Sequence, residues 1–438
     1  WSVLGLAPIA ALVAAAFSGE PLLAHWTQTF MGSAAGFVAQ FFPLFLLGAL
    51  FGKLMDDSGS VSAIARFMTD KLGPSRSVLA VVLAGALVTY GGVSLFVAMF
   101  VIAPMGQALF RAADIPNRLL PAAVMLGTAT FTMSALPGTP AIQNAIPMPF
   151  FGTNTFAAPG LGIIAGVFMF AFGQFWLNRR VAQARARGEG YGNHEDALSQ
   201  AAEQGMPPFW LALLPIVVVI VLNYIATSYV IPAMDTAYLA TDKFKKTPLS
   251  AVLGIWSIIL AMLVAITLVA VLNRKRIANL LDTFNKGTMG SLLPMANVAS
   301  EVAYGAVIAS LAAFAIVREG LKSVASDPVT SLFIVVTVLA GMTGSASGGM
   351  SLALGAMGEY YAHAAQAAGI NPEIMHRIAA LGSAAMDILP HNGAVITLLA
   401  ICSLTHRESY LDLFMVGSLS ALLSSVLVLG LNAVFGTF

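Results

Sequence analysis

The sequence predicts an all-α polytopic membrane protein with two inverted-topology repeats, each containing a re-entrant helical hairpin and a discontinuous transmembrane helix. Three observations predict this fold class. First, 58% of the 438 residues are hydrophobic and 9% are charged, whereas soluble domains carry about 25% charged residues. Second, the 40 glycines and 21 prolines are many for so apolar a chain, and in membranes such residues mark broken helices. Third, similar short motifs recur in two interrupted apolar regions.

The composition excludes several classes of protein. The 21 basic and 20 acidic side chains cannot cover a soluble protein of 45.6 kDa, which excludes a soluble enzyme, a nucleic-acid-binding protein and a disordered chain. The single cysteine, Cys402, excludes a disulfide framework. No HExxH, P-loop or GxSxG pattern occurs, so we expect no catalytic motif, no metal and no cofactor.

Apolar runs long enough to cross a membrane, about 20 residues each, define the candidate spans. The stretch 1–17 has no charged region before it, so we expect a first span there rather than a removed signal peptide. The candidate spans are 1–17, 36–54, 159–178, 209–231, 249–272, 291–317 and 411–435.

Two longer apolar regions, 78–150 and 329–403, are interrupted by glycine, proline and small polar residues. The piece 78–88 is too short to cross alone, so a hairpin that enters and leaves on one side is the simpler interpretation. We expect re-entrant hairpins at 78–110 and 329–364 and broken helices at 119–150 and 370–403. The interruptions lie at 89–94, 137–140, 343–351 and 390–393.

Lysine and arginine in the connecting segments predict the orientation. With both hairpins in place, fifteen of the 21 basic residues fall on one side and six on the other, which puts the N-terminus and the loop 179–206 in the cytoplasm. The first hairpin then enters from the cytoplasm and the second from the periplasm. His376 and Arg377 begin a span, and we expect them at the membrane interface.

The two interrupted regions resemble each other. GGVSL at 91–95 matches GGMSL at 348–352, and LPGTPA at 136–141 matches LPHNGA at 389–394. Upstream, Pro43 and Gly52 match Pro294 and Gly305, and the order of the matches is kept. The expected organisation is 1–35 as an N-terminal span and loop, 36–178 as repeat 1, 179–206 as a cytoplasmic linker, 207–290 as connecting spans and 291–438 as repeat 2.

Inverted repeats with paired broken helices are typical of secondary transporters, which bind their substrate at the breaks. A half-helix N-terminus offers N–H groups to a carboxylate, and a half-helix C-terminus offers carbonyls to a cation. Close helix packing by small residues is the alternative. The candidate substrate-binding residues are Gly91, Gly92, Ser94, Ser134, Thr139, Ser345, Ser347, Gly348, Gly349, Ser351, His391 and Asn392.

Ionisable residues inside apolar runs are candidates for ion coupling. Asp387 can carry a proton or cap the restarting half-helix, and His391 can donate to a substrate carboxylate or relay a proton. Glu301 shares a helix face with Asn297 and is either a coupling residue or an interhelical hydrogen-bond partner. The breaks contain no lysine or arginine, which favours a hydroxylated monocarboxylate over a multiply charged anion.

The run LPHNGAVITLL at 389–399, with LTHRESY at 404–410, GAMGE at 355–359 and HRIA at 376–379, resembles the gluconate/proton symporter (GntP) family of permeases, and most closely its hydroxybutyrate-permease branch. This family belongs to a wider ion-transporter superfamily. The resemblance implies an elevator-type transporter, with a scaffold, a mobile transport domain, proton coupling and a homodimer. The LPHNGA run differs from the sugar-acid members, which argues against gluconate itself.

We therefore expect a secondary active transporter in the bacterial inner membrane that imports a small hydroxy-monocarboxylate, either a hydroxybutyrate or a sugar acid such as gluconate. The expected partners are the organic anion, a coupling cation (a proton in preference to sodium), the lipid bilayer and a second copy of the chain, without nucleic acid. The alternatives are a sodium-coupled, citrate-like carboxylate transporter, an anion channel, and an intramembrane enzyme that uses Asp387 and His391.

Overall fold

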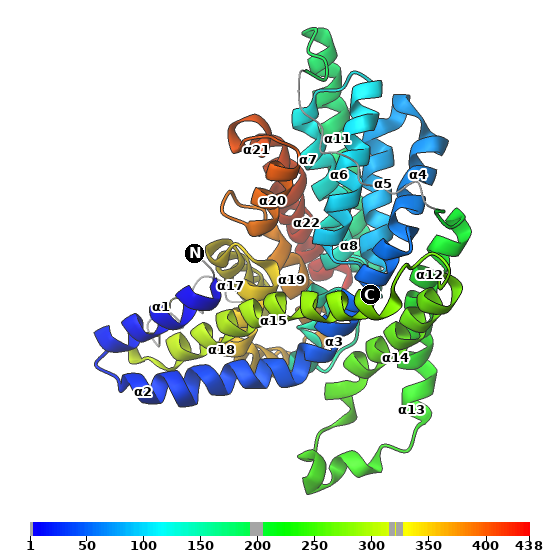
Figure 1. Ribbon diagram of the computed structural model, residues 1–438. Helices are drawn as coiled ribbons and strands as arrows, with labels where there is room; N and C mark the ends of the chain where they lie inside the picture. The colour runs from blue at the N-terminus through cyan, green and yellow to red at the C-terminus, as the bar shows by residue number, and fades with distance from the viewer. Residues whose placement is uncertain (1–2, 193–204, 315–319, 321–326) are drawn as a thin grey trace.

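The computed structural model describes residues 3–192, 205–314, 320 and 327–438, and this part of the chain forms helices and no strands (Figure 1). The all-helical membrane fold predicted from the composition is therefore confirmed. Within the described residues, seven helical segments are long and apolar enough to cross a membrane: Leu22–Asp57, Leu95–Ala112, Pro159–Ala186, Phe209–Ala233, Leu249–Leu272, Leu280–Ser310 and His406–Phe435.

The N-terminal helices precede the first interrupted region. Pro43 lies inside α3, and α4 follows after the left-handed Gly59. The elements are α1 (Val3–Phe17), α2 (Leu22–Ala24), the π-helical η1 (His25–Phe30), α3 (Met31–Asp57), α4 (Ser60–Leu72) and the 3-10 turn η2 (Pro74–Arg76).

Two helical hairpins occupy the regions expected to be re-entrant. The arms α5 (Ser77–Tyr90) and α6 (Leu95–Ala112) meet at a turn that contains Gly92 at φ 94°. The arms α17 (Pro328–Thr343) and α18 (Ala346–Ala367) meet at Gly344, with φ 64°, and Ser345. At 1.5 Å per residue, α5 and α17 are about 21 and 24 Å long, shorter than the ~30 Å hydrocarbon core.

The second hairpin corrects one expectation about where the chain is broken. The helix α18 begins at Ala346 because the Ser345 side chain accepts a hydrogen bond from Gly348 N (3.0 Å) and caps it. Ser347, Gly348, Gly349 and Ser351 therefore lie in the helix rather than in the interruption 343–351. Gly349 lets the two arms approach, since a Cβ there would overlap the Ala340 backbone.

Each hairpin is followed by an interrupted helix and then by a long one. The long helix α11 continues eight residues beyond the expected span end at 178. After the first hairpin come η3 (Asn117–Leu119), α7 (Leu120–Thr128), α8 (Phe131–Ser134), α9 (Ile142–Ala145), α10 (Met148–Phe151) and α11 (Pro159–Ala186). After the second come α19 (Pro372–Ala385), α20 (Gly393–Ile401), α21 (His406–Phe414), the π-helical η7 (Met415–Leu419) and α22 (Ser420–Phe435).

The helices between the two halves are strongly apolar. Trp210 and Val271 expose 73% and 68% of their surfaces, which suits contact with lipid. These elements are α12 (Phe209–Ile225), the π-helical η4 (Ala226–Val230), α13 (Ile231–Ala233), η5 (Ala237–Ala240), η6 (Asp242–Phe244) and α14 (Leu249–Leu272), and they are followed by α15 (Leu280–Ser310), which continues into the second half.

Packing divides the helices into two groups. In Figure 1, α3 and α15 lie side by side, while α5, α6, α7 and α11 form a separate group of aligned helices. The second group also includes α17–α22, because α5 packs on α7, α17 on α19, and α11 and α19 on α22. We call α5–α11 and α17–α22 the hairpin block.

An ionic cluster joins both halves of the hairpin block at one end. Asp412 of α21, 1% exposed, accepts hydrogen bonds from Arg180 Nε (2.7 Å), Trp176 Nε1 (2.9 Å) and Arg118 Nη1 (3.3 Å). Arg118 also donates to both oxygens of Glu189 (2.6 and 2.8 Å), and this hydrogen bonding lowers the pKa of the Glu189 carboxyl.

The matched motifs make similar contacts in the two halves. Thr139 Oγ1 accepts a hydrogen bond from Ala141 N (3.3 Å), and at the same two motif positions Asn392 Oδ1 accepts one from Ala394 N (2.7 Å). A Cβ on Gly52 of α3 would lie 3.7 Å from Val93, just before the second arm of the first hairpin. A Cβ on Gly305 of α15 would meet Leu352, in the second arm of the second hairpin.

Candidate functional site

The break between α19 and α20 is held to the tip of the second hairpin by Asn392. The Asn392 Oδ1 atom caps α20 by accepting hydrogen bonds from Ala394 N (2.7 Å) and Val395 N (3.0 Å). Its Nδ2 atom donates to Gly344 O at the hairpin tip (2.9 Å) and to Asp387 Oδ1 (2.9 Å). One side chain therefore fixes the half-helix start, the tip and the neighbouring acid.

Asp387 lies against the start of α18. Its Oδ1 atom accepts a hydrogen bond from Ala346 N (2.8 Å), the first helical N–H after Ser345. A carboxylate at this position is stabilised by the N-terminal end of the helix dipole. Asp387 therefore stabilises the start of α18 across the break, rather than capping α20, where Asn392 is the cap.

Glu301 approaches the same helix start from α15. Its carboxylate, only 7% exposed as a residue, hydrogen-bonds to the Ser345 side chain and interacts electrostatically with Asp387. A Cβ on Gly348 would overlap Glu301 Oε2, so the glycine makes room for the carboxylate. Glycine is therefore needed at position 348 because the Glu301 carboxylate of α15 fills the space that a side chain would occupy.

Three buried oxygen atoms near this contact have no hydrogen-bond partner among the described residues. They are Glu301 Oε2, Asn297 Oδ1 one turn earlier on the same face of α15, and Ser351 Oγ, one turn after Gly348 on α18. Unpaired buried oxygen atoms are costly unless a proton, a cation or water binds them. This facing surface of α15 and α18 therefore has the chemistry of a cation site.

His391 is exposed and lies against the hairpin tip. A Cβ on Gly344 would come within 2.6 Å of His391 Cδ2, and no hydrogen bond of the ring occurs within the described part of the chain. The preceding Pro390 O accepts a hydrogen bond from His406 Nε2 (2.8 Å), which fixes the loop. The imidazole is therefore open to a ligand.

The tip of the first hairpin is packed more tightly. A Cβ on Gly91 would lie 2.7 Å from Ile216 of α12, and one on Gly92 would lie 2.6 Å from Pro140. Tyr90 Oη donates to Pro137 O (2.7 Å) across the same contact. Ser94 precedes α6 without a side-chain cap bond.

The two polar candidates in the first interruption bond to nearby backbone. Ser134 Oγ donates to Thr130 O (3.1 Å), and Thr139 Oγ1 accepts from Ala141 N (3.3 Å).

The prediction that His376 and Arg377 lie at the membrane interface is wrong. Both are completely buried in α19. His376 contacts Thr153 Oγ1 (2.7 Å) and Asn144 Oδ1 (3.1 Å), and Arg377 donates to Ser134 O and Ala157 O (3.1 and 2.7 Å). Arg377 therefore places a fixed cation beside the first break, with its guanidinium bonded to protein carbonyl oxygens.

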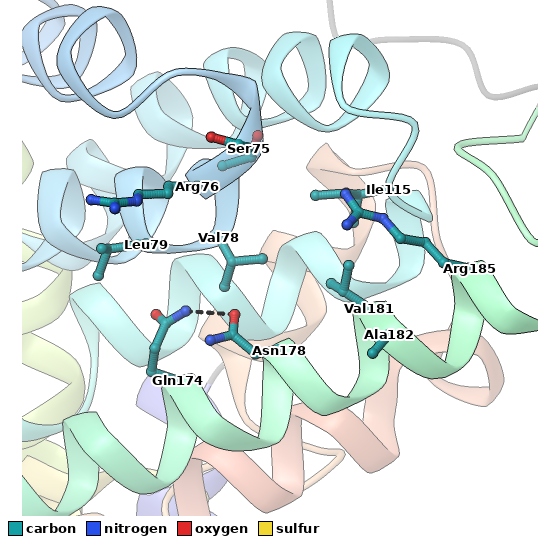
Figure 2. Close-up of a pocket in the computed structure, with 11 residues that line it drawn as sticks. Ser75, Arg76, Val78, Leu79, Ile115, Gln174, Asn178, Val181, Ala182 and Arg185 are labelled. Carbon is teal, nitrogen blue, oxygen red and sulfur yellow. Dashed lines mark hydrogen bonds between the residues drawn. The ribbon is translucent and has the colours of Figure 1, made fainter.

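The structure also contains a cavity of about 390 Å³ between the start of α5 and the later turns of α11 (Figure 2). Arg76 and Arg185 lie at its edges, and a Gln174–Asn178 hydrogen bond (2.9 Å) lies on α11. None of the candidate site residues lines it. The candidate site is instead the acidic cluster, which we define as Glu301, Ser345, Gly348, Asp387 and Asn392.

Comparisons with known proteins agree with the membrane fold. The sequence model of the family described as GntP family permease matches residues 4–431. An uncharacterized transporter of Bacillus subtilis (strain 168), YxjC, is 41% identical over 429 residues, covering 94% of this chain and 91% of the relative. An uncharacterized transporter of Haemophilus influenzae is 29% identical over 160 residues, 36% of this chain and 37% of the relative.

A solved structure has a similar fold. The crystal structure of the Alcanivorax borkumensis YdaH transporter, described as having an unusual topology, gives a TM-score of 0.61 at 17% identity. The match covers 94% of this chain and 89% of the YdaH chain. At this identity the similarity concerns the fold alone.

Proposed function

Because the chain belongs to the GntP family of permeases and is a multi-pass membrane transporter, we propose that it imports a small hydroxy-monocarboxylate together with a proton. The substrate class comprises hydroxybutyrates and small sugar acids. The observation that carries the proposal is the acidic cluster, where Glu301 of α15 and Asp387 and Asn392 of the break between α19 and α20 meet the tip of the second hairpin.

The substrate carboxylate binds beside the second hairpin tip. His391 is exposed and can donate to a carboxylate, and the partly exposed Ser347 hydroxyl lies in the first turn of α18. The substrate hydroxyl can pair with the remaining polar groups of the tip.

The proton binds at Glu301. Its carboxylate lies between α15, which we assign to the scaffold, and α18, which we assign to the mobile hairpin block. An ionised carboxylate buried between two helices opposes movement of one helix along the other, because it must leave Ser345 without a new partner. Protonation neutralises Glu301, which couples movement of the hairpin block to proton binding.

The proposal includes two inverted repeats, elevator-type movement, a homodimer and an inner-membrane location with a cytoplasmic N-terminus. The shared order of elements and the matching Thr139 and Asn392 bonds support the repeats. The short arms α5 and α17 support re-entrant hairpins. The excess of basic residues on one side supports the orientation.

The test is uptake of 3-hydroxybutyrate, gluconate and citrate into proteoliposomes under an imposed proton or sodium gradient. The proposal predicts accumulation of a hydroxy-monocarboxylate driven by the proton gradient. Dependence on sodium alone, or accumulation of citrate alone, would favour the citrate-like alternative. A channel would give no saturable counterflow.

Variants of the site complete this test. His391→Ala and Asp387→Asn should each reduce uptake at least tenfold. Glu359→Gln is the matched control, because Glu359 lies farther along α18 with its side chain 92% exposed and should leave uptake unchanged. Normal uptake by both site variants would show that the site is elsewhere.

A further inference from the structure

Arg377 is a buried cation without a carboxylate partner. Its residue exposure is 0%, and within the described residues no carboxylate oxygen lies within 4.0 Å of the guanidinium. The titratable groups that interact with it electrostatically are Glu373, one turn earlier in α19, the adjacent His376, and Tyr90. The Glu373 Oε2 atom is instead bonded to Ala158 N (2.9 Å). Buried arginines are normally paired with an anion, so this arrangement needs an explanation.

The guanidinium is bonded entirely to uncharged carbonyl oxygens. Nε and Nη2 donate to Ala157 O (3.1 and 2.7 Å), and Nη1 donates to Ser134 O (3.1 Å) and to Asn144 Oδ1 (3.2 Å). We call these three oxygens the carbonyl cage. Two are backbone carbonyls, at the end of α8 and just before α11, where helix breaks leave carbonyls unpaired, and the third is the side-chain oxygen of Asn144 in α9. Converging carbonyl oxygens at a broken helix are a cation-binding arrangement.

The guanidinium is closely surrounded. A Cβ on Gly162 of α11 would lie 2.5 Å from Ala135 O and 3.2 Å from Arg377 Nε, so α11 leaves no spare room beside the cation. Asn144 is fixed by its own bonds from Nδ2 to Thr139 O (3.0 Å) and Thr155 O (2.9 Å), which aim its Oδ1 at Arg377. The cage is therefore rigid and matched to a planar cation.

We propose that Arg377 is a tethered cation that permanently fills the carbonyl cage at the first break, so that this break takes no cation from solution. The corresponding second break contains the acidic cluster, with Asp387 bonded to the start of α18. The two breaks therefore carry opposite charge. This inference rests on the proposed function in one respect: it assigns uptake of the coupling cation to the second break alone.

The experiment empties the cage and offers a free cation. Arg377→Ala is measured by thermal unfolding in detergent with guanidinium chloride up to about 20 mM, far below the molar concentrations that denature proteins. Choline chloride at equal concentration controls for ionic strength. The proposal predicts a melting midpoint lowered by roughly 5 °C or more, with at least half of the loss restored by guanidinium and none by choline. Wild type and Arg66→Ala, whose side chain is 65% exposed, should not respond.

Two further variants keep the test decisive if Arg377→Ala does not fold. Arg377→Lys keeps the charge with fewer donors and should melt between wild type and Arg377→Ala. Arg377→Met fills the space without charge and should be destabilised, because the cage carbonyls lose their donors. A Met variant as stable as wild type, or an Ala variant indifferent to guanidinium, would overturn the proposal.

The thermal readout uses no substrate and so separates this inference from the transport proposal. If wild-type protein fails to transport but guanidinium still stabilises Arg377→Ala, the carbonyl cage stands and the transport assignment falls. If wild-type protein transports with protons but no variant responds to guanidinium, the transport assignment stands and the carbonyl cage falls. In the transport assay, guanidinium should also raise uptake by Arg377→Ala at least threefold.

Discussion

Replacing Gly348 by alanine tests whether Glu301 acts through the start of α18. The added Cβ would overlap the Glu301 carboxylate, whereas the nearest atom of any other residue, Ser345 Oγ, would lie 2.9 Å away. Because Oε2 is the end of a flexible side chain, the carboxylate can swing aside without moving the backbone. The substitution therefore displaces the acid from Ser345 while leaving the helices in place.

The expected change in stability is small and has two parts. Loss of a hydrogen bond to a charged group costs about 1.5–3 kcal/mol. Alanine in place of glycine inside a helix returns up to about 1 kcal/mol. The net destabilisation is about 0.5–3 kcal/mol. Uptake should fall at least tenfold, because the displaced Glu301 carboxylate no longer contacts the hairpin and its protonation no longer controls hairpin movement.

The matched control is Gly355→Ala, two turns later in α18, where the nearest atom to an added Cβ is Val302 Cγ1 at 3.8 Å. This variant should be as stable as wild type or slightly more stable, with unchanged uptake. Combining Gly348→Ala with Glu301→Ala should give non-additive melting changes, since the overlap disappears. Equal uptake by Gly348→Ala and Gly355→Ala would refute the role assigned to Glu301.

Three further predictions concern the hydrogen bonds and ion pairs that hold the hairpin block together. Asn392→Ala should lower stability by about 1–2 kcal/mol through loss of the α20 cap and should reduce uptake, whereas Asn392→Asp should keep the cap but still be destabilised, because its second oxygen would face Gly344 O and Asp387 Oδ1 without a donor. Asp412→Asn should cost about 1.5–3 kcal/mol, because Arg180 loses its charged acceptor while Arg118 keeps Glu189; Asp70→Asn, at a side chain 66% exposed, should leave the melting midpoint unchanged. The lowered pKa of Glu189 means that its pairing with Arg118 adds stability above the unfolded pKa of about 4.3 and loses it as the pH falls through the folded value. The melting difference between wild type and Glu189→Gln should therefore be present at pH 7 and shrink below about pH 4.

The sequence predicted the apolar helices and several of the polar residues that the structure brings together. Apolar runs gave the helices because a membrane span requires length and hydrophobicity. Asp387, Asn392 and Glu301 were identified because ionisable and amide side chains are costly in apolar surroundings and are kept where they bind something. Their assembly around Ser345 depends on contacts between α15, α18 and the second break, which no local pattern contains.

The position of the second hairpin tip was misread for a physical reason. The motifs at 91–95 and 348–352 have similar residues but lie at different positions relative to the helix start. The start of α18 is set by the Ser345 cap, four residues before Gly349. Glycines at 348 and 349 serve packing against Glu301 and Ala340, a requirement that arises only in the folded protein.

The burial of Arg377 could not be found from its position in the sequence. An arginine near the start of an apolar helix is typical of the membrane interface. Here the segment between α8 and α11, more than 200 residues earlier in the chain, covers it and supplies its acceptors. The extension of α11 to Ala186 was missed because a helix that leaves the membrane has the polar composition of a loop.

The most direct test of the central claim compares accumulation and exchange in proteoliposomes that contain Glu301→Gln. Neutral glutamine mimics the protonated acid, so the hairpin block should still move and exchange labelled 3-hydroxybutyrate for unlabelled substrate in counterflow. The same variant should not accumulate substrate under an imposed proton gradient, whereas wild type should. Proton-driven accumulation by Glu301→Gln at the wild-type level would contradict the account.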